Sequence, residues 1–222
     1  MNTNSKRTLL SWSSGKDSAY ALRLLLKDPT INLVGLFTTV NKKFDRVAMH
    51  ATRVKLLKQQ ADACDLPIHI IEIPSHCSNE EYEQTMLEFI TKIKKDNIDT
   101  VAFGDLYLED IRNYRIKQMK DTGIKPIFPC WGIDTKELSK RIIDIGIKAN
   151  ITCIDPKQIS TDFAGHIFDH SLLESLPNSV DPCGENGEFH TFVYDSPDFK
   201  NPITIKKGKT IERDGFVFTD WL

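Results

Sequence analysis

The chain has 222 residues, of which 40% are hydrophobic, enough for the buried core of one large domain or two small ones. Its 29 Lys and Arg residues against 31 Asp and Glu residues give a net charge of −2, which offers no electrostatic basis for avid nucleic-acid binding. No apolar run approaches the roughly 20 residues of a membrane span. We therefore expect neither DNA nor a membrane among its partners.

The five cysteines are scattered, and none forms a C-x-x-C pair. This spacing argues against zinc ribbons and thioredoxin-like redox sites and favours reduced thiols in a cytoplasmic protein. The first 18 residues, MNTNSKRTLLSWSSGKDS, lack the apolar core of a signal peptide. The predicted location is the cytoplasm.

The first half of the chain alternates short apolar runs with amphipathic segments, the pattern of a parallel sheet covered by helices. The run at 68–73 is continuously apolar, which predicts burial on both faces. Ser78 and Glu81 have capping-box spacing at the start of a long helix. We predict strands at 8–12, 31–40, 68–73 and 100–104, and helices at 18–27, 50–64, 78–97 and 108–120.

The amino-acid composition changes after residue 130, where Gly, Pro, Asn and His become frequent. We predict a helix at 134–148, strands at 151–154 and 190–194, and an antiparallel hairpin or meander with turns at Lys207-Gly208 and Asp214-Gly215. The fold class is thus α/β, with a doubly wound, Rossmann-like parallel sheet and a smaller mixed α/β domain. The predicted domains are 1–130, which binds nucleotide, and 131–222, which binds substrate.

The stretch SWSSGKDSAY at 11–20 follows the first strand and opens the first helix. A glycine turn at this position presents backbone N–H groups and the positive helix end to an anion. Ser13, Ser14 and Ser18 add hydroxyls, and Lys16 adds a positive charge. The sequence therefore predicts a phosphate site, and an ordinary turn with a serine-rich cap is the alternative.

The residues SSGKDS resemble the PP-loop, S-G-G-K-D-S, of ATP pyrophosphatases, which cleave ATP between its α and β phosphates. Ser14 replaces the first glycine of that pattern, which tightens the steric demands of the turn. Asp17 stands where a kinase-type loop has Ser or Thr after its lysine. We expect this carboxylate to hold Mg²⁺ against the pyrophosphate oxygens.

A second motif, DPCGENGEFHTF, occupies residues 181–192, and a glycine-rich turn with acids exposed by chance is the alternative reading. Together with the loop it resembles the diphthine-ammonia ligase family, whose C-terminal signature is E-G-G-E-Y-E-T. Asn186 and His190 depart from that signature, and Phe189 is conservative for its tyrosine. The segments at 104–106 and 112–115 also resemble the family. The matching positions are Glu185, Gly187, Glu188 and Thr191.

The resemblance implies an ATP- and Mg²⁺-dependent amidation. A substrate carboxylate attacks the α-phosphorus of ATP, pyrophosphate leaves, and ammonia then displaces AMP to give an amide. The acceptor implied is diphthine, a modified histidine of an elongation factor, and the implied assembly is a homodimer. Because His190 replaces an acid, the same chemistry on a small-molecule or cofactor carboxylate is one alternative. A nucleotide-binding sensor of the universal-stress type is the other.

The predicted site combines nucleotide, catalytic and substrate residues. Asp105 could instead cap a helix, and Arg112 and Arg115 could lie on a solvated face. The nucleotide contacts are Ser13, Ser14, Gly15, Lys16, Ser18, Thr38, Thr39 and Gly104. The catalytic residues are Lys16, Asp17, Glu185, Glu188 and Arg115, with Asp17 as the metal ligand. The substrate contacts are Asp105, Arg112, Gly187, His190 and Thr191.

Other reactive side chains are weaker candidates. A nucleophilic Cys183 is disfavoured, because no second cysteine is near in sequence to resolve an intermediate. His166 and His170 are four residues apart and could share a helical face, but they lack partner acids at zinc-ligand spacing. His76-Cys77 is expected to be an ordinary loop.

Overall fold

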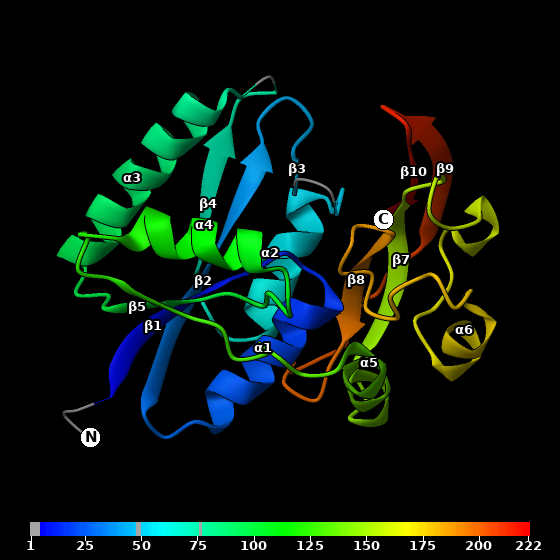
Figure 1. The fold of residues 1–222 in the computed structure, drawn as a ribbon, viewed down its shortest axis with the longest axis horizontal. Helices are drawn as coiled ribbons and strands as arrows, with labels where there is room; N and C mark the ends of the chain where they lie inside the picture. The colour runs from blue at the N-terminus through cyan, green and yellow to red at the C-terminus, as the bar shows by residue number, and fades with distance from the viewer. Residues whose placement is uncertain (1–4, 48–49, 76) are drawn as a thin grey trace.

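The computed structural model describes residues 5–47, 50–75 and 77–222, which form two sheets with helices around them (Figure 1). In sheet A, β2 pairs in parallel with β1 and β4, β1 with β5, and β5 with β6. Within the described residues, only the short β3 runs antiparallel in this sheet. The predicted doubly wound parallel sheet is therefore confirmed. Its strands are β1 (Lys6–Ser11), β2 (Ile31–Asn41), β3 (Arg46–Val47), β4 (Ile68–Ile73), β5 (Thr100–Ala102) and β6 (Lys125–Ile127).

Helices cover both faces of sheet A. Alternate residues of a strand point to opposite faces, so apolar side chains of one strand pack against the helices on both sides. Leu10 and Leu36 enter the core that contains α1 and α2, whereas their neighbours Leu9 and Phe37 enter the core that contains α3. In the described part of the chain, no helix is long and apolar enough to cross a membrane. The helices are α1 (Lys16–Lys27), α2 (Val54–Ala63), α3 (Asn79–Lys95) and α4 (Glu109–Met119).

The start of α3 is set by the predicted capping box. The Ser78 hydroxyl accepts the N–H of Glu81 at 3.1 Å, and the Glu81 carboxylate accepts the N–H of Ser78 at 2.8 Å. The adjacent strand β4 differs from its prediction, since only Ile71 in it is fully buried. Among the described strands, β4 pairs with β2 alone, so it lies at the edge of sheet A. An edge strand has no neighbouring strand along one of its two long sides, which leaves it partly exposed even when both of its faces contact a core.

Helix α2 begins at Val54 and not at residue 50 as predicted. The residues before it form the short β3 and a turn that is tied to the far end of the chain. Arg46 and Arg53 both pair with Asp220, and these two guanidinium groups lower the pKa of the Asp220 carboxyl to about 2 despite its partial burial. The anchored turn therefore stops the helix from extending backward to residue 50.

Sheet B is antiparallel and has the order β8-β7-β10-β9. Its core is continuous with that of α1 and α2, because Ile151 and Phe192 join the same buried cluster as Leu22 and Leu57. The smaller mixed unit is confirmed as part of the fold class. Its elements are α5 (Thr135–Asp144), β7 (Lys148–Ile154), the 3₁₀ turn η1 (Thr161–Phe163), α6 (His170–Ser175), β8 (Phe189–Asp195), β9 (Lys207–Arg213) and β10 (Phe216–Trp221).

Two local predictions in this half are wrong, and one is confirmed. The turn at Asp214-Gly215 joins β9 to β10, and both residues have the positive φ that such a turn needs. Lys207-Gly208 lies inside β9 because its backbone continues the pairing with β10. His166 and His170 share no helical face, since α6 begins only at His170. His76 lies outside the described residues.

Candidate active site

The loop of residues 13–18 connects β1 to α1 and turns at Ser14. The φ of Ser14 is 74°, in the left-handed region that glycine adopts at little cost and other residues rarely enter. A hydrogen bond of 2.6 Å between the Ser14 and Thr52 hydroxyls offsets part of that cost. The position at which the PP-loop pattern has glycine is therefore the position whose backbone conformation favours glycine.

The N-terminus of α1 opens from this loop. Gly15 is the N-cap residue and has no side chain to cap the helix, but the Thr191 hydroxyl accepts the N–H of Lys16, the first helical residue, at 3.1 Å. The Ser18 hydroxyl donates to the Gly15 carbonyl at 2.8 Å, and the Ser13 hydroxyl donates to Ser18 at 3.2 Å. These serines fix the shape of the loop, and the dipole of a helix favours anions at its N-terminus.

Lys16 is the most buried charge of the loop, with 1% of its surface exposed. Its Nζ lies 2.9 Å from the Asp17 carboxylate and also donates to the Cys183 carbonyl. The rings of Phe168 and Phe189 lie 5.3 Å from Nζ. Burial disfavours the ammonium form, but the negative charge of Asp17 opposes it, and the net result is a raised pKa. Lys16 is thus a fixed positive charge where the two predicted motifs meet.

Strand β8 holds the loop from the other side. The Val193 N–H donates to the Ser14 carbonyl at 3.0 Å. Gln60, which is fully buried, donates through Nε2 to the carbonyls of Ser14 and Val193, and its Oε1 accepts the indole N–H of Trp12. The Gln60 side chain therefore connects the loop to strand β8 of sheet B through hydrogen bonds.

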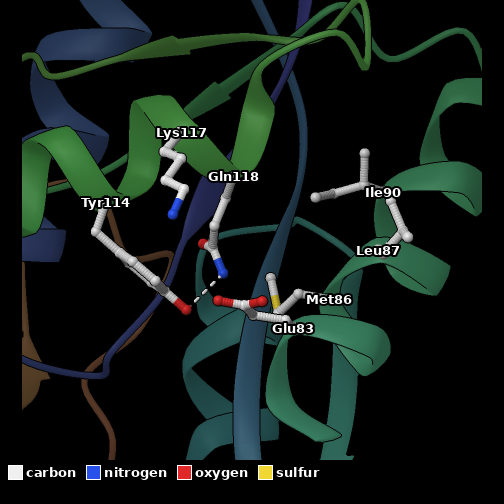
Figure 2. Close-up of a pocket in the computed structure, with 7 residues that line it drawn as sticks. All are labelled: Glu83, Met86, Leu87, Ile90, Tyr114, Lys117 and Gln118. Carbon is white, nitrogen blue, oxygen red and sulfur yellow. Dashed lines mark hydrogen bonds between the residues drawn. The ribbon is translucent and has the colours of Figure 1, made fainter. Parts of the chain in front are cut away.

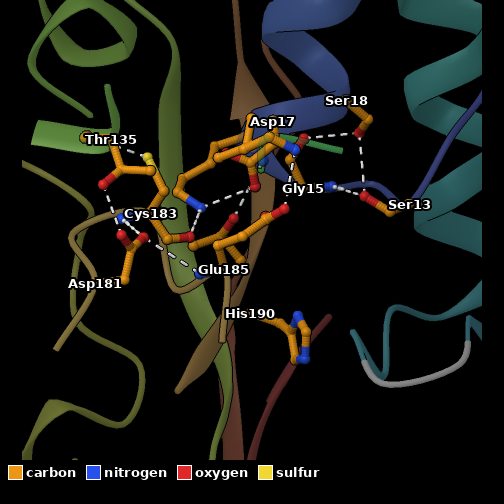
Figure 3. A network of polar contacts seen from close by, with 12 residues as sticks. Ser13, Gly15, Asp17, Ser18, Thr135, Asp181, Cys183, Glu185 and His190 are labelled. Carbon is orange, nitrogen blue, oxygen red and sulfur yellow. Dashed lines mark hydrogen bonds and ion pairs between the residues drawn. The ribbon is translucent and has the colours of Figure 1, made fainter. Parts of the chain in front are cut away.

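A cavity of about 430 Å³ lies where the loop, the end of β5 and the segment 181–191 come together. Figure 3 shows the loop residues facing this segment, with Glu185 beside Asp17. Gly104 permits the close approach of β5, because a Cβ there would lie 3.3 Å from the backbones of Asp17 and Ser18. The predicted residues that line the cavity are Ser13, Lys16, Asp17, Ser18, Gly104, Asp105, Arg115, Glu185, His190 and Thr191.

Three carboxyl groups share this cavity. Burial raises the pKa of Glu185 to about 7, aided by the charge of Asp17 and opposed by the hydrogen bond from the Leu106 N–H at 2.9 Å. Burial also raises the pKa of Asp105, against the pull of Arg115 at 4.0 Å. Asp17 Oδ1 and Asp105 Oδ2 are buried without a hydrogen-bond partner among the described residues. Those residues contain no preformed cluster of three or more metal-ligating side chains.

Two family models together match most of the chain. One is described as the diphthamide synthase N-terminal domain and matches residues 6–126, and the other is described as the diphthamide synthase C-terminal domain and matches residues 134–219. The chain belongs to the diphthamide synthase family. The resemblance predicted from the loop and the glutamate motif is therefore confirmed, and the family is one of ATP-using ligases.

Curated relatives of this family member are named diphthine–ammonia ligase. The Homo sapiens protein is 24% identical over 90% of this chain and 82% of its own length, and the Bos taurus protein is 25% identical over 93% and 85%. The Schizosaccharomyces pombe protein is 22% identical over 90% of this chain but only 36% of its own length. A solved structure described as a predicted subunit of tRNA methyltransferase, from Methanocaldococcus jannaschii, gives a TM-score of 0.44 at 17% identity, covering 89% of this chain and 100% of the other.

In this member of the diphthamide synthase family, the two signature glutamates have different surroundings. Glu185 lines the cavity, whereas Glu188 is 2% exposed and turns into its own loop. The Glu188 carboxylate accepts the N–H of Asp181 at 2.8 Å and the N–H of Asn186 at 3.0 Å, and it also accepts the Asn186 side-chain amide. Asp181 in turn accepts the Thr135 hydroxyl at 2.6 Å and the N–H of Cys183 at 2.8 Å. Glu188 therefore holds the shape of the loop.

Other predicted site residues of the family member lie outside the cavity lining. Thr38 and Thr39 pair with β4 in the middle of sheet A. The Arg112 guanidinium lies 4.5 Å from the centre of the Trp131 ring and 5.4 Å from that of Phe128. The residues that the cavity does not include are Ser14, Gly15, Thr38, Thr39, Arg112, Gly187 and Glu188.

His50 lines the cavity and was missed, because the helix predicted from residue 50 concealed it. It lies in the turn before α2, and its ring is 4.7 Å from that of His190, centre to centre. The buried hydrogen bonds of Gln60 were also missed. The spacing of Gln60 from Leu56 and Leu57 on α2 was the available signal for its burial, but its partners Ser14 and Val193 lie far away in the sequence. A histidine shortly after a strand of a doubly wound sheet was the available signal for His50.

Cys183 lines the cavity, but the surroundings of its thiol disfavour a nucleophile. Burial raises its pKa, and Sγ donates to the Thr135 carbonyl at 3.4 Å. All five cysteines of the chain are unpaired, as predicted.

A second cavity, of about 190 Å³, lies between α3 and α4 (Figure 2). Its walls are mainly apolar, and its one internal hydrogen bond in Figure 2 runs from the Gln118 amide to the Tyr114 hydroxyl at 2.8 Å. It contains none of the predicted site residues of this family member. Its lining is Glu83, Met86, Leu87, Ile90, Tyr114, Lys117 and Gln118.

Proposed function

We propose that this family member is an ATP-dependent carbon–nitrogen ligase of diphthamide biosynthesis, which adenylates a carboxylate, releases pyrophosphate and AMP, and forms an amide from ammonia. The observation that carries the proposal is the meeting of the loop 13–18 with the segment 181–191 around one cavity. At this junction Lys16 is held between the Asp17 carboxylate and the Cys183 carbonyl. The names of the curated relatives support the reaction class.

The loop supplies the groups for the phosphates of ATP. The N-terminus of α1 and the hydroxyls of Ser13 and Ser18 suit an anion, and the Lys16 ammonium balances the charge that develops on departing pyrophosphate. Arg115, at the opposite wall, is our candidate for the α-phosphate. Thr38, Thr39 and Gly104 remain our candidates for the nucleoside end.

The carboxylates of the cavity fit a magnesium ion. Asp17 Oδ1 and Asp105 Oδ2 have no hydrogen-bond partner in the described chain, and a carboxylate or two together with waters and phosphate oxygens is a common Mg²⁺ donor set. Bound there, the ion would neutralise phosphate charge and orient the leaving group. Lys16 would continue to hold Asp17 in place.

Glu185 is our candidate for holding ammonia. Its half-buried carboxylate is close enough to Asp17 and Lys16 to be affected by their charges, and its pKa of about 7 means that a carboxylate and a carboxylic acid are both populated near neutrality. The carboxylate form attracts ammonium out of water, and the Leu106 N–H fixes its orientation. His190, Thr191 and Gly187 remain candidates for acceptor contacts.

The reaction class is tested with the purified protein, ATP, Mg²⁺, ammonium and an elongation factor that carries diphthine. We expect AMP and pyrophosphate in equal amounts, both dependent on the acceptor. Formation of ADP and phosphate would contradict the proposal. Tight ATP binding without AMP under any acceptor would indicate a nucleotide sensor instead.

The same half-reaction on a small-molecule carboxylate is the second candidate, and one observation favours it. His190 stands in the cavity wall where the signature of the family has an acid, and burial lowers its pKa well below the usual value. A neutral imidazole offers no charge to a cationic acceptor such as diphthine. AMP formation with small carboxylic acids but not with the elongation factor would establish this second candidate.

A further inference from the structure

The orientation of His50 is fixed by its backbone partner. Nδ1 lies 3.0 Å from the carbonyl oxygen of Thr191. A carbonyl oxygen only accepts hydrogen bonds, so Nδ1 must carry the hydrogen, and in the neutral ring the lone pair is then on Nε2. No other described residue forms a hydrogen bond with the ring, and His50 lines the cavity.

The ring is also held rigidly against the phosphate loop. A Cβ added to Gly15 would lie 2.7 Å from Cε1 of His50, so the imidazole packs on the bare backbone of the N-cap residue. The ring also contacts that of His190, at 4.7 Å between centres and with 44° between the planes. The imidazole is therefore positioned between the two motifs.

Burial favours the neutral form of His50, and the charged groups around the ring modify this preference in both directions. Burial lowers its pKa and Lys16 lowers it further, whereas the hydrogen bond to Thr191 and the charge of Asp17 act in the opposite direction. His190, on β8, is itself held neutral by burial and by the proximity of His50 and Lys16. A neutral imidazole with one free ring nitrogen is ready to accept a proton.

We propose that His50 is a further catalytic residue, whose Nε2 accepts the proton that the attacking ammonia loses as the amide forms. This inference rests on the proposed function. In the step, a bond forms between the ammonia nitrogen and the acyl carbon, and the bond from that carbon to the AMP oxygen breaks. The electron pair of that bond leaves with AMP, and one proton moves from nitrogen to His50 Nε2, which gives imidazolium. Glu185 holds the ammonia, and His50 takes its proton.

The test separates the two half-reactions in the His50→Asn variant. The amide nitrogen of asparagine lies near the position of Nδ1 and retains a donor for Thr191, but nothing replaces Nε2. His170→Asn is the matched control, because that histidine is exposed and pairs with Asp144. The acceptor is the elongation factor that carries diphthine. Pyrophosphate release, amide formation from ammonium, and hydroxamate formation from hydroxylamine are measured at pH 7.5.

We expect His50→Asn to release pyrophosphate within about twofold of the parent and to form amide at least about 100-fold more slowly. Hydroxylamine is uncharged at this pH and strongly nucleophilic, so hydroxamate formation should fall only a few-fold. Imidazole added to His50→Ala should restore part of the amide formation. The control should match the parent throughout.

Equal losses with ammonium and hydroxylamine, or no rescue by imidazole, would overturn the assignment, because His50 would then only support the loop. Loss of pyrophosphate release in His50→Asn would overturn it as well and would assign the residue to the ATP half-reaction. Failure of the parent itself to release pyrophosphate with any acceptor would instead reject the proposed function. The parent and variant arms therefore separate the two failures.

Discussion

The loop 13–18 and the segment 181–191 meet at one cavity but use their polar groups differently. In the loop, serine hydroxyls hold the backbone and the charged residues Lys16 and Asp17 face the cavity. In the second segment, one glutamate holds the backbone and the other faces the cavity. Neutral hydroxyls thus do in the first region what a buried carboxylate does in the second. Two acids three residues apart therefore need not share a role.

The largest effect is expected at the junction of the two regions, in Lys16→Ala. Losing a buried cation from the proposed pyrophosphate site should lower acceptor-dependent AMP formation by at least about 1000-fold. Lys140→Ala, at an exposed lysine of α5, should have the activity of the parent. A fully active Lys16→Ala protein would remove the loop from the mechanism.

The hydrogen bonds by which Gln60 connects the loop 13–18 to β8 are tested with Gln60→Leu. Leucine has a similar volume but leaves the Trp12 indole and the carbonyls of Ser14 and Val193 with one partner fewer. We expect the free energy of unfolding to fall by about 3 kcal/mol or more, as measured by urea denaturation. The neighbouring exposed Gln59→Leu should change it by less than about 0.5 kcal/mol.

The different roles of Glu185 and Glu188 are tested by measuring the stability of variants, and the first variant is Glu188→Gln. A glutamine places an amide NH₂ against N–H groups that now donate to a carboxylate, so the free energy of unfolding should fall by about 2–3 kcal/mol. Asn186→Ala, which removes only the side-chain donor, should have a smaller effect. An unchanged stability in Glu188→Gln would contradict its role in holding the loop.

Glu185→Gln should raise the free energy of unfolding at high pH, whereas Glu188→Gln should lower it. The folded protein keeps a proton on Glu185 up to a pKa of about 7, whereas the unfolded chain loses it near the ordinary glutamate value, so this group lowers stability as pH rises through that window. Removing it should raise the free energy of unfolding by roughly 1–3 kcal/mol at pH 8 and change little at pH 4. Amide formation should nevertheless fall. Equal effects on stability at both pH values would contradict the raised pKa.

The smallest effect concerns the strained turn of the first region. Ser14→Ala and Ser14→Gly both lose the hydrogen bond to Thr52, but only glycine adopts a φ of 74° without cost. The glycine variant should therefore be more stable than the alanine variant by about 1 kcal/mol in urea denaturation. Equal stability of the two variants would show that this turn stores no strain.

The elements with strong local signals were predictable from the sequence. The capping box at Ser78 and the alternating pattern of sheet A required only neighbouring residues. The edge position of β4 and the late start of α2 were not predictable, because the first depends on strand order and the second on Asp220, far along the chain. The pattern of neighbouring residues in the sequence carries no information about contacts between distant parts of the chain.

The candidate site divides in the same way. The motif residues that line the cavity, such as Lys16, Asp17 and Glu185, follow from the local loop pattern and the family resemblance. The inward turn of Glu188 does not, since it depends on which N–H groups the folded loop presents. His50 and Gln60 belong to no motif, and only the packing of β8 against the loop reveals them.

The hydrogen bond from the Lys16 N–H to Thr191 joins residues that are 175 positions apart. During synthesis on the ribosome, the loop 13–18 leaves the exit tunnel long before strand β8, which holds it, has been made. A nascent first half therefore lacks the Thr191 hydroxyl and the Val193 N–H that hold the loop in the folded protein. The loop can therefore reach its final hydrogen-bonded shape only after β8 has been synthesised.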